Sequence, residues 1–243
     1  MESLQDIHKR HSGRLVNKWR HYLEIYDQFL PPYRKQDVII LEFGVAHGGS
    51  LQLWRNYFGP SAKIFGVDVN PECKKFEEGN TKVIIGSQED ANFLTELKSM
   101  IPPVDILIDD GGHTMKQQIM TFNHLFDQVK DGGLYFCEDT HTSYWDDYYG
   151  GLRKKGTFIE FAKNFIDDIH GWHFKKNGKP YVTDITRNVR GLHFYDSMVI
   201  IEKQKMNKPE NTAVGEETLS HHIADFGHRK TLIKTIKKIA KRK

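Results

Sequence analysis

Two pairs of adjacent carboxylates follow two of the apolar runs in this 243-residue chain. The first pair, Asp109 and Asp110, ends the run ILIDD, and the second, Glu138 and Asp139, ends GLYFCED. Carboxylates held close together repel one another and raise each other's pKa. A hard divalent cation relieves that repulsion, and Mg²⁺ prefers oxygen ligands together with several waters. The pattern predicts a magnesium site; in the alternative interpretation, these acids cap helices or pair with Lys and Arg.

A histidine follows each acidic pair. His113 comes three residues after Asp110, and His141 comes two residues after Asp139. An imidazole with an ordinary pKa of about 6.5 suits a general base beside a metal-bound hydroxyl. Most single histidines are structural, but His113 lies just past the first acidic pair, beside the predicted metal. We therefore predict His113 as the catalytic base and keep His141 as the competing candidate, which could instead orient a ligand or substrate.

A glycine-rich turn follows the first apolar run, in the stretch EFGVAHGGS. Gly44, Ala46 and Gly49 occupy the positions of a G-x-G-x-x-G turn, with Ala in the middle and Ser50 directly after it. Such residues let the backbone approach a ligand closely and open the next helix. Glu42 lies two residues before the first glycine, where its carboxylate could reach a cationic amino group. The turn therefore predicts a cofactor site.

Two further strand ends carry residues suited to an adenosyl cofactor. Asp68 ends GVDVN, roughly 20 residues after the glycines, where an acid binds a ribose diol. Ser87 and Gln88, in GSQED, fall where an adenine edge would lie, although Asp90 in the same stretch is also a plausible helix N-cap. A nicotinamide dinucleotide binds its pyrophosphate at a helix N-terminus and does not need Glu42. S-adenosylmethionine has an amino group and no phosphate, so the pattern favours it.

The elements that must position these residues alternate between apolar runs and helical runs. The apolar runs cover 38–44, 63–69, 82–86, 106–109 and 133–139, and the helical runs cover 50–58, 91–100, a stretch reaching about Lys130, and 157–170. The strands are apolar throughout, as expected when helices cover both faces. Alternation of this kind predicts a doubly wound, mostly parallel α/β sheet. RGLHFYDSMVIIEK, at 190–203, predicts an antiparallel hairpin at the end of a seven-stranded sheet.

The chain divides into three predicted parts. Residues 1–36 form an N-terminal helical segment, because Leu15, Trp19 and Tyr22 follow helical spacing. Residues 37–204 form the domain that carries the site. Residues 205–243 form a polar linker and a basic helix, which either lies in solvent or contacts an anionic membrane surface or acidic partner.

Composition restricts the partners and the compartment. The net charge of +3 is too small to indicate nucleic acid. Cys73 and Cys137 lie far apart without metal-ligand spacing, and Cys137, in the apolar run LYFC, is predicted to be a core thiol. This cysteine usage favours a reducing cytoplasm. The N-terminus lacks the apolar core of a signal peptide, and no stretch approaches the roughly 20 apolar residues of a membrane span. We expect a cytoplasmic homo-oligomer that is at most peripheral to a membrane.

Four stretches together resemble the metal-dependent class I methyltransferases: LEFGVAHGGSLQLWRNYF, GVDV, ILIDDGGHT and GLYFCEDTHTSYWDDYYGG. The similarity is greatest to the mycinamicin and macrocin O-methyltransferases, which act on sugar hydroxyls in macrolide biosynthesis. The cephalosporin hydroxylase-like group is a more distant relative. The resemblance covers roughly residues 38–203 and implies a Rossmann-like methyltransferase fold, S-adenosylmethionine and Mg²⁺.

The resemblance also implies individual roles. Asp110, Glu138 and Asp139 correspond to the metal ligands and His113 to the general base, which leaves Asp109 as a supporting or cofactor-facing residue. This chain departs from the family in having Gly112 where relatives often have Ser, in having Ala46 where they have glycine, and in its short leader.

The implied reaction is O-methylation of a sugar with vicinal hydroxyls, in a glycan or a glycosylated natural product. The aromatic residues Tyr144, Trp145, Tyr148 and Tyr149 would cover the acceptor, since flat rings pack well on sugar rings. They serve equally well as core or oligomer contacts. One alternative is a catechol-type or other vicinal-diol O-methyltransferase, and another is a non-catalytic subunit that binds S-adenosylmethionine.

Overall fold

The structure, a computed structural model, describes residues 2–34 and 36–218. The chain divides into two compact units, residues 1–208 and 209–243. Residues 209–218 of the second unit form no helix or strand. The predicted basic C-terminal helix lies outside the described residues.

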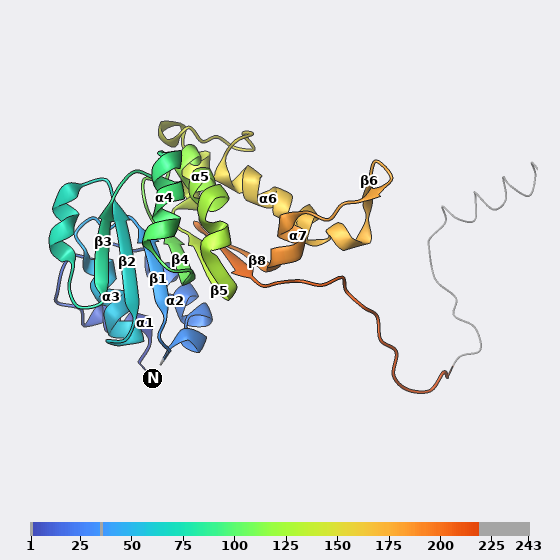
Figure 1. Cartoon of the computed structure of the whole chain (residues 1–243), viewed down its shortest axis with the longest axis horizontal. Helices are drawn as coiled ribbons and strands as arrows, with labels where there is room; N and C mark the ends of the chain where they lie inside the picture. Colours follow the sequence, from blue (N-terminus) through green and yellow to red (C-terminus); the bar gives the residue numbers. More distant parts are fainter. Residues whose placement is uncertain (1, 35, 219–243) are drawn as a thin grey trace, which may run out of the picture. The chain divides into compact units, whose positions relative to one another are not determined.

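Seven strands form the central sheet of the first unit, in the order β3-β2-β1-β4-β5-β9-β8 (Figure 1). Five of them run parallel: β1 (Ile39–Phe43), β2 (Lys63–Asp68), β3 (Thr81–Ile85), β4 (Val104–Asp109) and β5 (Val129–Cys137). The antiparallel hairpin of β8 (Val189–Tyr195) and β9 (Met198–Lys203) follows β5. The predicted α/β class, the strand number and the terminal hairpin are confirmed.

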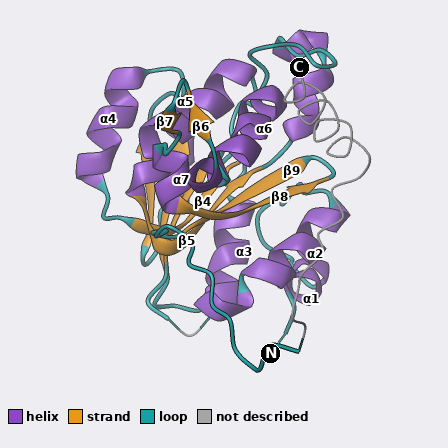
Figure 2. Ribbon diagram, turned by 90° about the vertical axis from the view of Figure 1, so that its right-hand side faces the viewer, coloured by secondary structure: helices purple, strands orange, loops and turns teal. Residues whose placement is uncertain are grey.

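Helices cover both faces of this sheet (Figure 2). One face packs against α1 (Leu4–Lys9), α2 (Arg20–Phe29) and α3 (Gly49–Phe58). The other packs against α4 (Ala91–Met100), α5 (Met115–Leu125), α6 (Phe158–Ile169) and α7 (Asp184–Asn188). Successive apolar residues of β1 and β4 alternate between the two cores, so these strands are apolar on both faces over most of their length. A two-stranded hairpin of β6 (Lys175–Lys176) and β7 (Lys179–Pro180) lies outside the main sheet.

The N-terminal segment differs from the single amphipathic helix that its spacing suggests. Helices α1 and α2 are separated by residues 10–19, which are not helical. Leu15 and Trp19, expected on an apolar helix face, are 63% and 55% exposed. The helical pattern starts only at α2, where Tyr22 and Tyr26 are buried. The connecting segment is held by polar contacts instead, among them His11 Nε2 with the carbonyl oxygen of Arg14 at 2.7 Å.

The helix predicted to reach about Lys130 ends at Leu125. A short 3-10 helix follows, and β5 begins at Val129, earlier than expected. Pairing of β4 with β5 shifts from Val104 opposite Val129 to Ile106 opposite Leu134. The shift accommodates Gly132, whose φ is 81°. A charged, glycine-containing stretch (KDGG) therefore belongs to the strand, although its composition is typical of a loop.

Both cysteines are buried and free, as predicted for Cys137. Within the ranges 2–34 and 36–218, no helix is long and apolar enough to cross a membrane.

Candidate active site at the carboxyl ends of the strands

The chemistry-bearing residues meet where the sheet order reverses, at the carboxyl ends of β1, β4 and β5. Asp109 pairs with Phe43 on one side and with Cys137 on the other. This register places the glycine turn and both acidic pairs at one edge of the sheet. Ligands of open α/β sheets bind at such a switch point.

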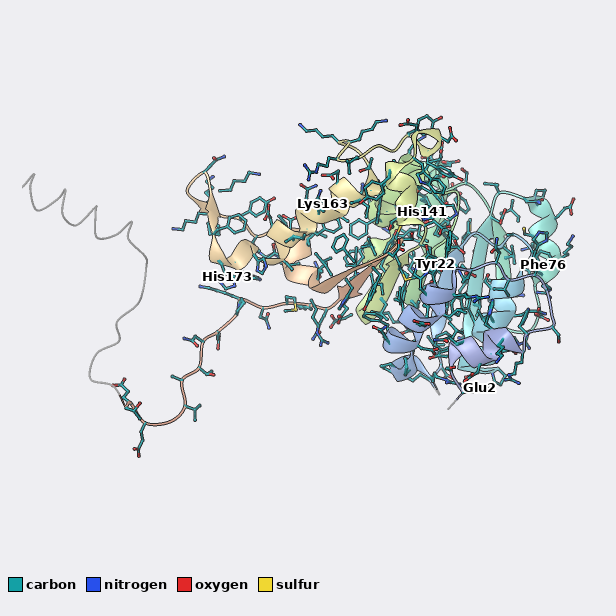
Figure 3. The ribbon with its side chains drawn as sticks, turned by 180° about the vertical axis from the view of Figure 1, so that it is seen from behind. Glu2, Tyr22, Phe76, His141, Lys163 and His173 are labelled. Atoms are coloured by element: carbon teal, nitrogen blue, oxygen red, sulfur yellow. The ribbon has the colours of Figure 1, made fainter. Side chains whose placement is uncertain are left out.

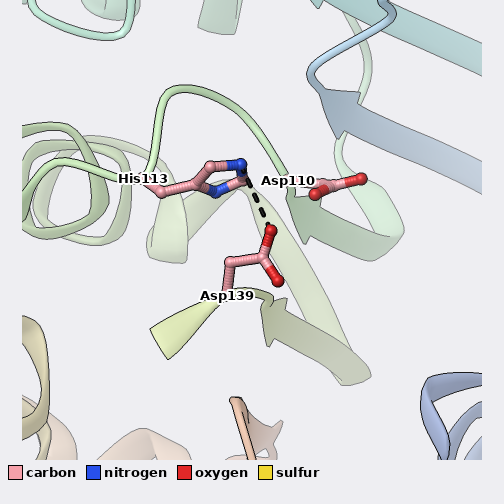
Figure 4. Close-up of side chains that lie close together, drawn as sticks. All are labelled: Asp110, His113 and Asp139. Atoms are coloured by element: carbon pink, nitrogen blue, oxygen red, sulfur yellow. Dashed lines mark ion pairs between the residues drawn. The ribbon is translucent and has the colours of Figure 1, made fainter. Parts of the chain in front are cut away.

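Asp110, His113 and Asp139 form the metal-competent cluster of the described chain (Figure 4). Each offers one ligand atom, and these atoms all lie within 4.8 Å of one another. His113 Nε2 lies 3.4 Å from Asp139 Oδ2. The two carboxylates suit a hard divalent cation, whereas the imidazole is a ligand more typical of transition metals.

His113 and Asp139 both adopt left-handed backbone conformations, with φ of 57° and 52°. Such conformations are uncommon outside glycine, cost energy and often occur at functional sites. One hydroxyl supports both residues: Thr142 Oγ1 lies 2.9 Å from the His113 carbonyl oxygen and 2.8 Å from that of Asp139. Buried Thr142 thus connects the two strained residues across the site.

Lys18 enters the acidic site from the segment between α1 and α2. Its Nζ donates to Asp110 Oδ2 at 2.8 Å and to Glu138 Oε1 at 2.6 Å, and lies 3.9 Å from Glu42 Oε1. Burial alone would lower the pKa of Lys18, but these three carboxylates outweigh it and raise that pKa above its ordinary value. Lys18 is therefore a buried ammonium ion.

Glu138 lies apart from the three-residue cluster. Its Oε1 accepts from Lys18 and from the hydroxyl of Tyr26. Of the three predicted ligands, the structure brings Asp110 and Asp139 together with His113 and directs Glu138 toward Lys18. The ligand role of Glu138 stays a prediction.

Asp109 is buried beneath the site and does not face it. Its carboxylate accepts from Gln88 Nε2 at 2.6 Å and from the Tyr135 hydroxyl at 3.1 Å. Gln88 Oε1 accepts from the Gly112 amide at 3.0 Å. Gln88, predicted to meet an adenine edge, thus connects Asp109 to the glycines before His113 and fixes the loop that carries the histidine.

A cavity of about 410 Å³ lies beside the cluster and is lined by four of the predicted cofactor residues, Gly44, Ala46, Asp68 and Gln88. A Cβ at position 44 would lie 1.9 Å from the Asp110 carbonyl oxygen, so only glycine fits this close approach. Asp68 Oδ2 accepts from the amides of Val45 and Ala46 at 2.9 and 3.0 Å, which shapes the turn itself.

The other predicted cofactor residues on β1, α3 and the loop after β3 do not line this cavity. Ser50 Oγ donates to Glu42 Oε2 at 2.8 Å, while Glu42 Oε1 is buried without a hydrogen-bond partner in the described chain. Gly49 packs under the N-terminal segment, where an added Cβ would lie 2.2 Å from the Leu15 carbonyl oxygen. Ser87 Oγ accepts from the Glu89 amide at 3.1 Å in a local turn. Glu42 therefore keeps an unused acceptor, as the prediction of an amino-group partner requires.

A second cavity of about 520 Å³ adjoins the first and shares Asn17, Asp110 and Asp139 with it. Tyr22 lines this cavity and donates to Asp139 Oδ1 at 2.7 Å. His141 lies close to Tyr22 in Figure 3, and its Nδ1 is 2.9 Å from Ser197 Oγ. The two cavities thus meet at the predicted metal ligands.

An aromatic surface continues outward from His141. The His141 ring contacts the indole of Trp145 at a centroid distance of 4.5 Å and that of Trp19 at 6.0 Å. Tyr144, Trp145 and Tyr149 are 49%, 50% and 72% exposed. These three residues are accessible to an acceptor, and their substrate role stays a prediction.

The site carries more negative than positive charge. Burial raises the pKa values of Glu42, Asp110 and Glu138 each to about 7. One ammonium ion does not neutralise them together with Asp139. The same carboxylates that hold Lys18 would therefore gain from a divalent cation.

A pH dependence of stability follows from these carboxyl groups. Their pKa values are about 7 in the folded chain, against about 4 in an unfolded one. The folded state therefore binds more protons between pH 5 and 7, and the free energy of unfolding falls as pH rises through that range. We expect the Tm measured in chelator to drop by about 5 °C from pH 5.5 to 7.5. In Glu138→Gln the decrease in Tm should be smaller, because one of the three titrating groups is absent. A Tm that rises over this range in the unmodified protein would contradict the expectation.

Sequence reasoning missed Lys18, Asn17 and Tyr26. Lys18 belongs to the charged run VNKWRHY, and nothing in its type or spacing marks it as buried. Its placement depends on long-range packing of a non-helical segment. The one available signal is the charge balance, since five acids at the strand ends need more cations than the strands provide.

Known proteins were compared with the chain. No protein-family model matches it. It is 34% identical over 188 residues to the mycinamicin VI 2''-O-methyltransferase of Micromonospora griseorubida, covering 73% of this chain and 47% of the relative. It is 32% identical over 212 residues to the demethylmacrocin O-methyltransferase of Streptomyces fradiae, covering 82% and 53%. The chain spans about half the length of the curated relatives it matches.

Solved structures agree with the sequence relatives. The MycE methyltransferase of the mycinamycin biosynthetic pathway, in complex with Mg and SAH, superposes with a TM-score of 0.77 at 31% identity, covering 84% of this chain and 55% of that one. The complex that also contains mycinamycin VI gives a TM-score of 0.72. By its fold the chain is a Rossmann-like class I methyltransferase domain, and over 73% to 82% of its length its sequence is similar to those of macrolide sugar O-methyltransferases.

Proposed function

We propose that the chain transfers a methyl group from S-adenosylmethionine to a hydroxyl of a sugar, in a Mg²⁺-dependent reaction on a glycosylated small molecule. The observation that carries this proposal is the meeting of two cavities at Asp110 and Asp139, with His113 beside them. One cavity has the glycine turn and Asp68, which suit the cofactor, and the other opens toward exposed aromatic rings. The sequence relatives, which are sugar O-methyltransferases, support the same reaction class.

The cofactor would be held by residues of the glycine turn and of β1. Gly44 and Ala46 would allow close contact, Asp68 would face the ribose, and Oε1 of Glu42, which has no hydrogen-bond partner in the described chain and lies 3.9 Å from Lys18 Nζ, would accept from the amino group. The buried, raised-pKa carboxyl of Glu42 becomes ionised when a cationic amino group approaches it. This arrangement directs the sulfonium methyl toward the neighbouring cavity and His113.

The acidic residues hold the metal and the acceptor. Asp110 and Asp139 would bind Mg²⁺, with Glu138 as the third ligand after release from Lys18. These residues would hold the ion where it would supply Lewis-acid chemistry and lower the pKa of an acceptor hydroxyl. His113 takes the hydroxyl proton as the acceptor oxygen attacks the methyl carbon in line, so that the carbon–sulfur bond breaks and S-adenosylhomocysteine leaves. The chain contributes chiefly orientation and electrostatic stabilisation.

The acceptor is a sugar carried on a small molecule. Trp145 presents an exposed ring next to His141, and Tyr144 and Tyr149 are also exposed; such rings pack on the apolar face of a sugar. His141, held by Ser197, then orients the acceptor while His113 acts as base. We also propose a cytoplasmic homo-oligomer, in which the basic C-terminal stretch provides any contact with a membrane surface; the two buried free thiols support the reducing compartment.

A methyl-transfer screen tests this function. The full chain is incubated with methyl-labelled S-adenosylmethionine and sets of free, nucleotide-linked, lipid-linked and natural-product-linked sugars, with Mg²⁺ or with chelator. We expect label in a glycosylated small molecule with vicinal hydroxyls, and loss of transfer in chelator because acceptor ionisation needs the metal. Transfer to catechols alone would favour the other vicinal-diol reaction. Cofactor binding without transfer to any acceptor would indicate the non-catalytic role.

A further inference from the structure

Lys18 reaches the acidic site from a segment that is anchored at its other end. Arg14 makes the contacts that anchor this segment. Its amide donates to Gln52 Oε1 at 2.8 Å, and its guanidinium pairs with Glu78 at 3.2 Å. The guanidinium also lies 4.9 Å from the centroid of the Phe76 ring. From this anchor the chain crosses Gly49 and delivers Lys18, whose side chain is 1% exposed.

The ammonium group of Lys18 is hydrogen-bonded to carboxylate oxygens that a metal would need as ligands. Its Nζ lies 2.8 Å from Asp110 Oδ2 and 2.6 Å from Glu138 Oε1. Mg²⁺ binds carboxylate oxygens at about 2.1 Å. An ion that used the lone pairs to which Lys18 donates would overlap the ammonium nitrogen, and like charge opposes it as well. Lys18 and a metal therefore compete for these two oxygens of Asp110 and Glu138.

We infer that Lys18 is an internal competitor for the divalent cation, so that metal binding expels its side chain from the acidic site. Residues 17–19 then act as a latch that is closed without metal and released with it. This inference rests on the proposed metal site. It goes further by coupling metal loading to the position of the N-terminal segment.

The exchange is favoured by charge and affects both cavities. Lys18 sets one positive charge against Glu42, Asp110 and Glu138, and a divalent cation neutralises more of that charge. Asn17, next to Lys18, lines the cofactor cavity and the acceptor cavity alike. Release of the latch thus changes the walls of both cavities when the metal arrives, before the acceptor is bound.

Titration with Mg²⁺, followed by calorimetry in the absence of cofactor, tests the competition. Lys18→Met removes the competing charge but keeps the length of the side chain, and we expect its Kd for Mg²⁺ to fall at least about tenfold, or 1.4 kcal/mol. Lys9→Met is the matched control, because Lys9 is an exposed lysine of the preceding helix and its loss changes the net charge equally. Equal affinity of Lys18→Met and the unmodified chain would overturn the latch and leave the proposed function intact. Absence of Mg²⁺ binding in both would overturn the metal site together with the latch.

The unmodified chain provides a second measurement that does not depend on how Lys18→Met folds. Trypsin cleaves after lysine and arginine, and Lys18 is shielded while its ammonium is buried. We expect saturating Mg²⁺ to accelerate cleavage after Lys18 several-fold, while cleavage in the exposed β6–β7 hairpin, after Lys175 and Lys176, stays constant. Protection of Lys18 by Mg²⁺, or an unchanged rate there, would overturn the inference.

Discussion

Asp110→Asn is expected to reduce the rate of methyl transfer by about three orders of magnitude and to weaken Mg²⁺ binding in parallel. A metal ion contributes several kcal/mol through charge stabilisation at the acceptor, and 1.4 kcal/mol corresponds to a factor of ten. Asp110 is the residue that both cavities, the metal-competent cluster and Lys18 have in common. Steady-state rates with labelled cofactor and Mg²⁺ calorimetry on the same preparation measure the two effects.

Two asparagine variants make the Asp110 experiment specific. Asp147→Asn removes an exposed carboxylate a few residues from Asp139, and it should leave both the rate and the Mg²⁺ affinity unchanged. Asp109→Asn replaces one of the two oxygens that accept from Gln88 and Tyr135 with an NH₂ donor, so we expect lower stability and a moderate loss of rate with Mg²⁺ affinity largely retained. If Asp109→Asn abolished Mg²⁺ binding and Asp110→Asn did not, the assignment of the ligand would be reversed.

Most of the sheet could be predicted because its strands are buried on both faces. The run ILI before Asp109 is apolar at every position, since Ile106 and Ile108 enter one core and Leu107 the other. Fully apolar runs with helical runs between them permit few arrangements besides a doubly wound sheet. The place of the site followed from the same topology, because ligands collect at the carboxyl ends of parallel strands.

Local pattern was a poor guide where long-range contacts decide the conformation. Leu15 and Trp19 have helical spacing, yet the segment around them is extended along α3 and held by Arg14 and the Lys18 ion pairs. β5 begins at Val129 because the irregular pairing accommodates Gly132, a residue that usually marks a loop. Neither outcome can be read from residues next to each other in the sequence.

The candidate site divides in the same way. Adjacent acids at the strand ends predicted a cation site, and the position of Asp109 below it agrees with the supporting role that the resemblance implies. Which carboxylates converge could not be predicted, because rotamers and partners decide it. Glu138 turns to Tyr26 and Lys18, two residues contributed by the N-terminal segment, whereas Asp139 turns to His113.

His113→Gln separates the role of a base from that of a ligand. If His113 removes the acceptor proton, its loss should lower kcat by about 10²- to 10⁴-fold while Mg²⁺ affinity changes little. The increase of the rate with rising pH, which reports deprotonation of the base, should disappear as well. Glutamine keeps most of the volume of imidazole and so preserves packing beside Asp139.

The competing candidate serves as the control for that experiment. His141→Gln should chiefly raise KM for the acceptor and leave the pH–rate profile unchanged. His141 is hydrogen-bonded to Ser197 and packs against the exposed indoles of Trp19 and Trp145. A loss of Mg²⁺ affinity in His113→Gln, comparable with that in Asp110→Asn, would instead make His113 a metal ligand, as its position within the three-residue cluster allows. Either result also assigns a role to Glu138. If His113 is the base, Glu138 becomes the third metal ligand after Lys18 withdraws. If His113 binds the metal, Glu138 stays paired with Lys18.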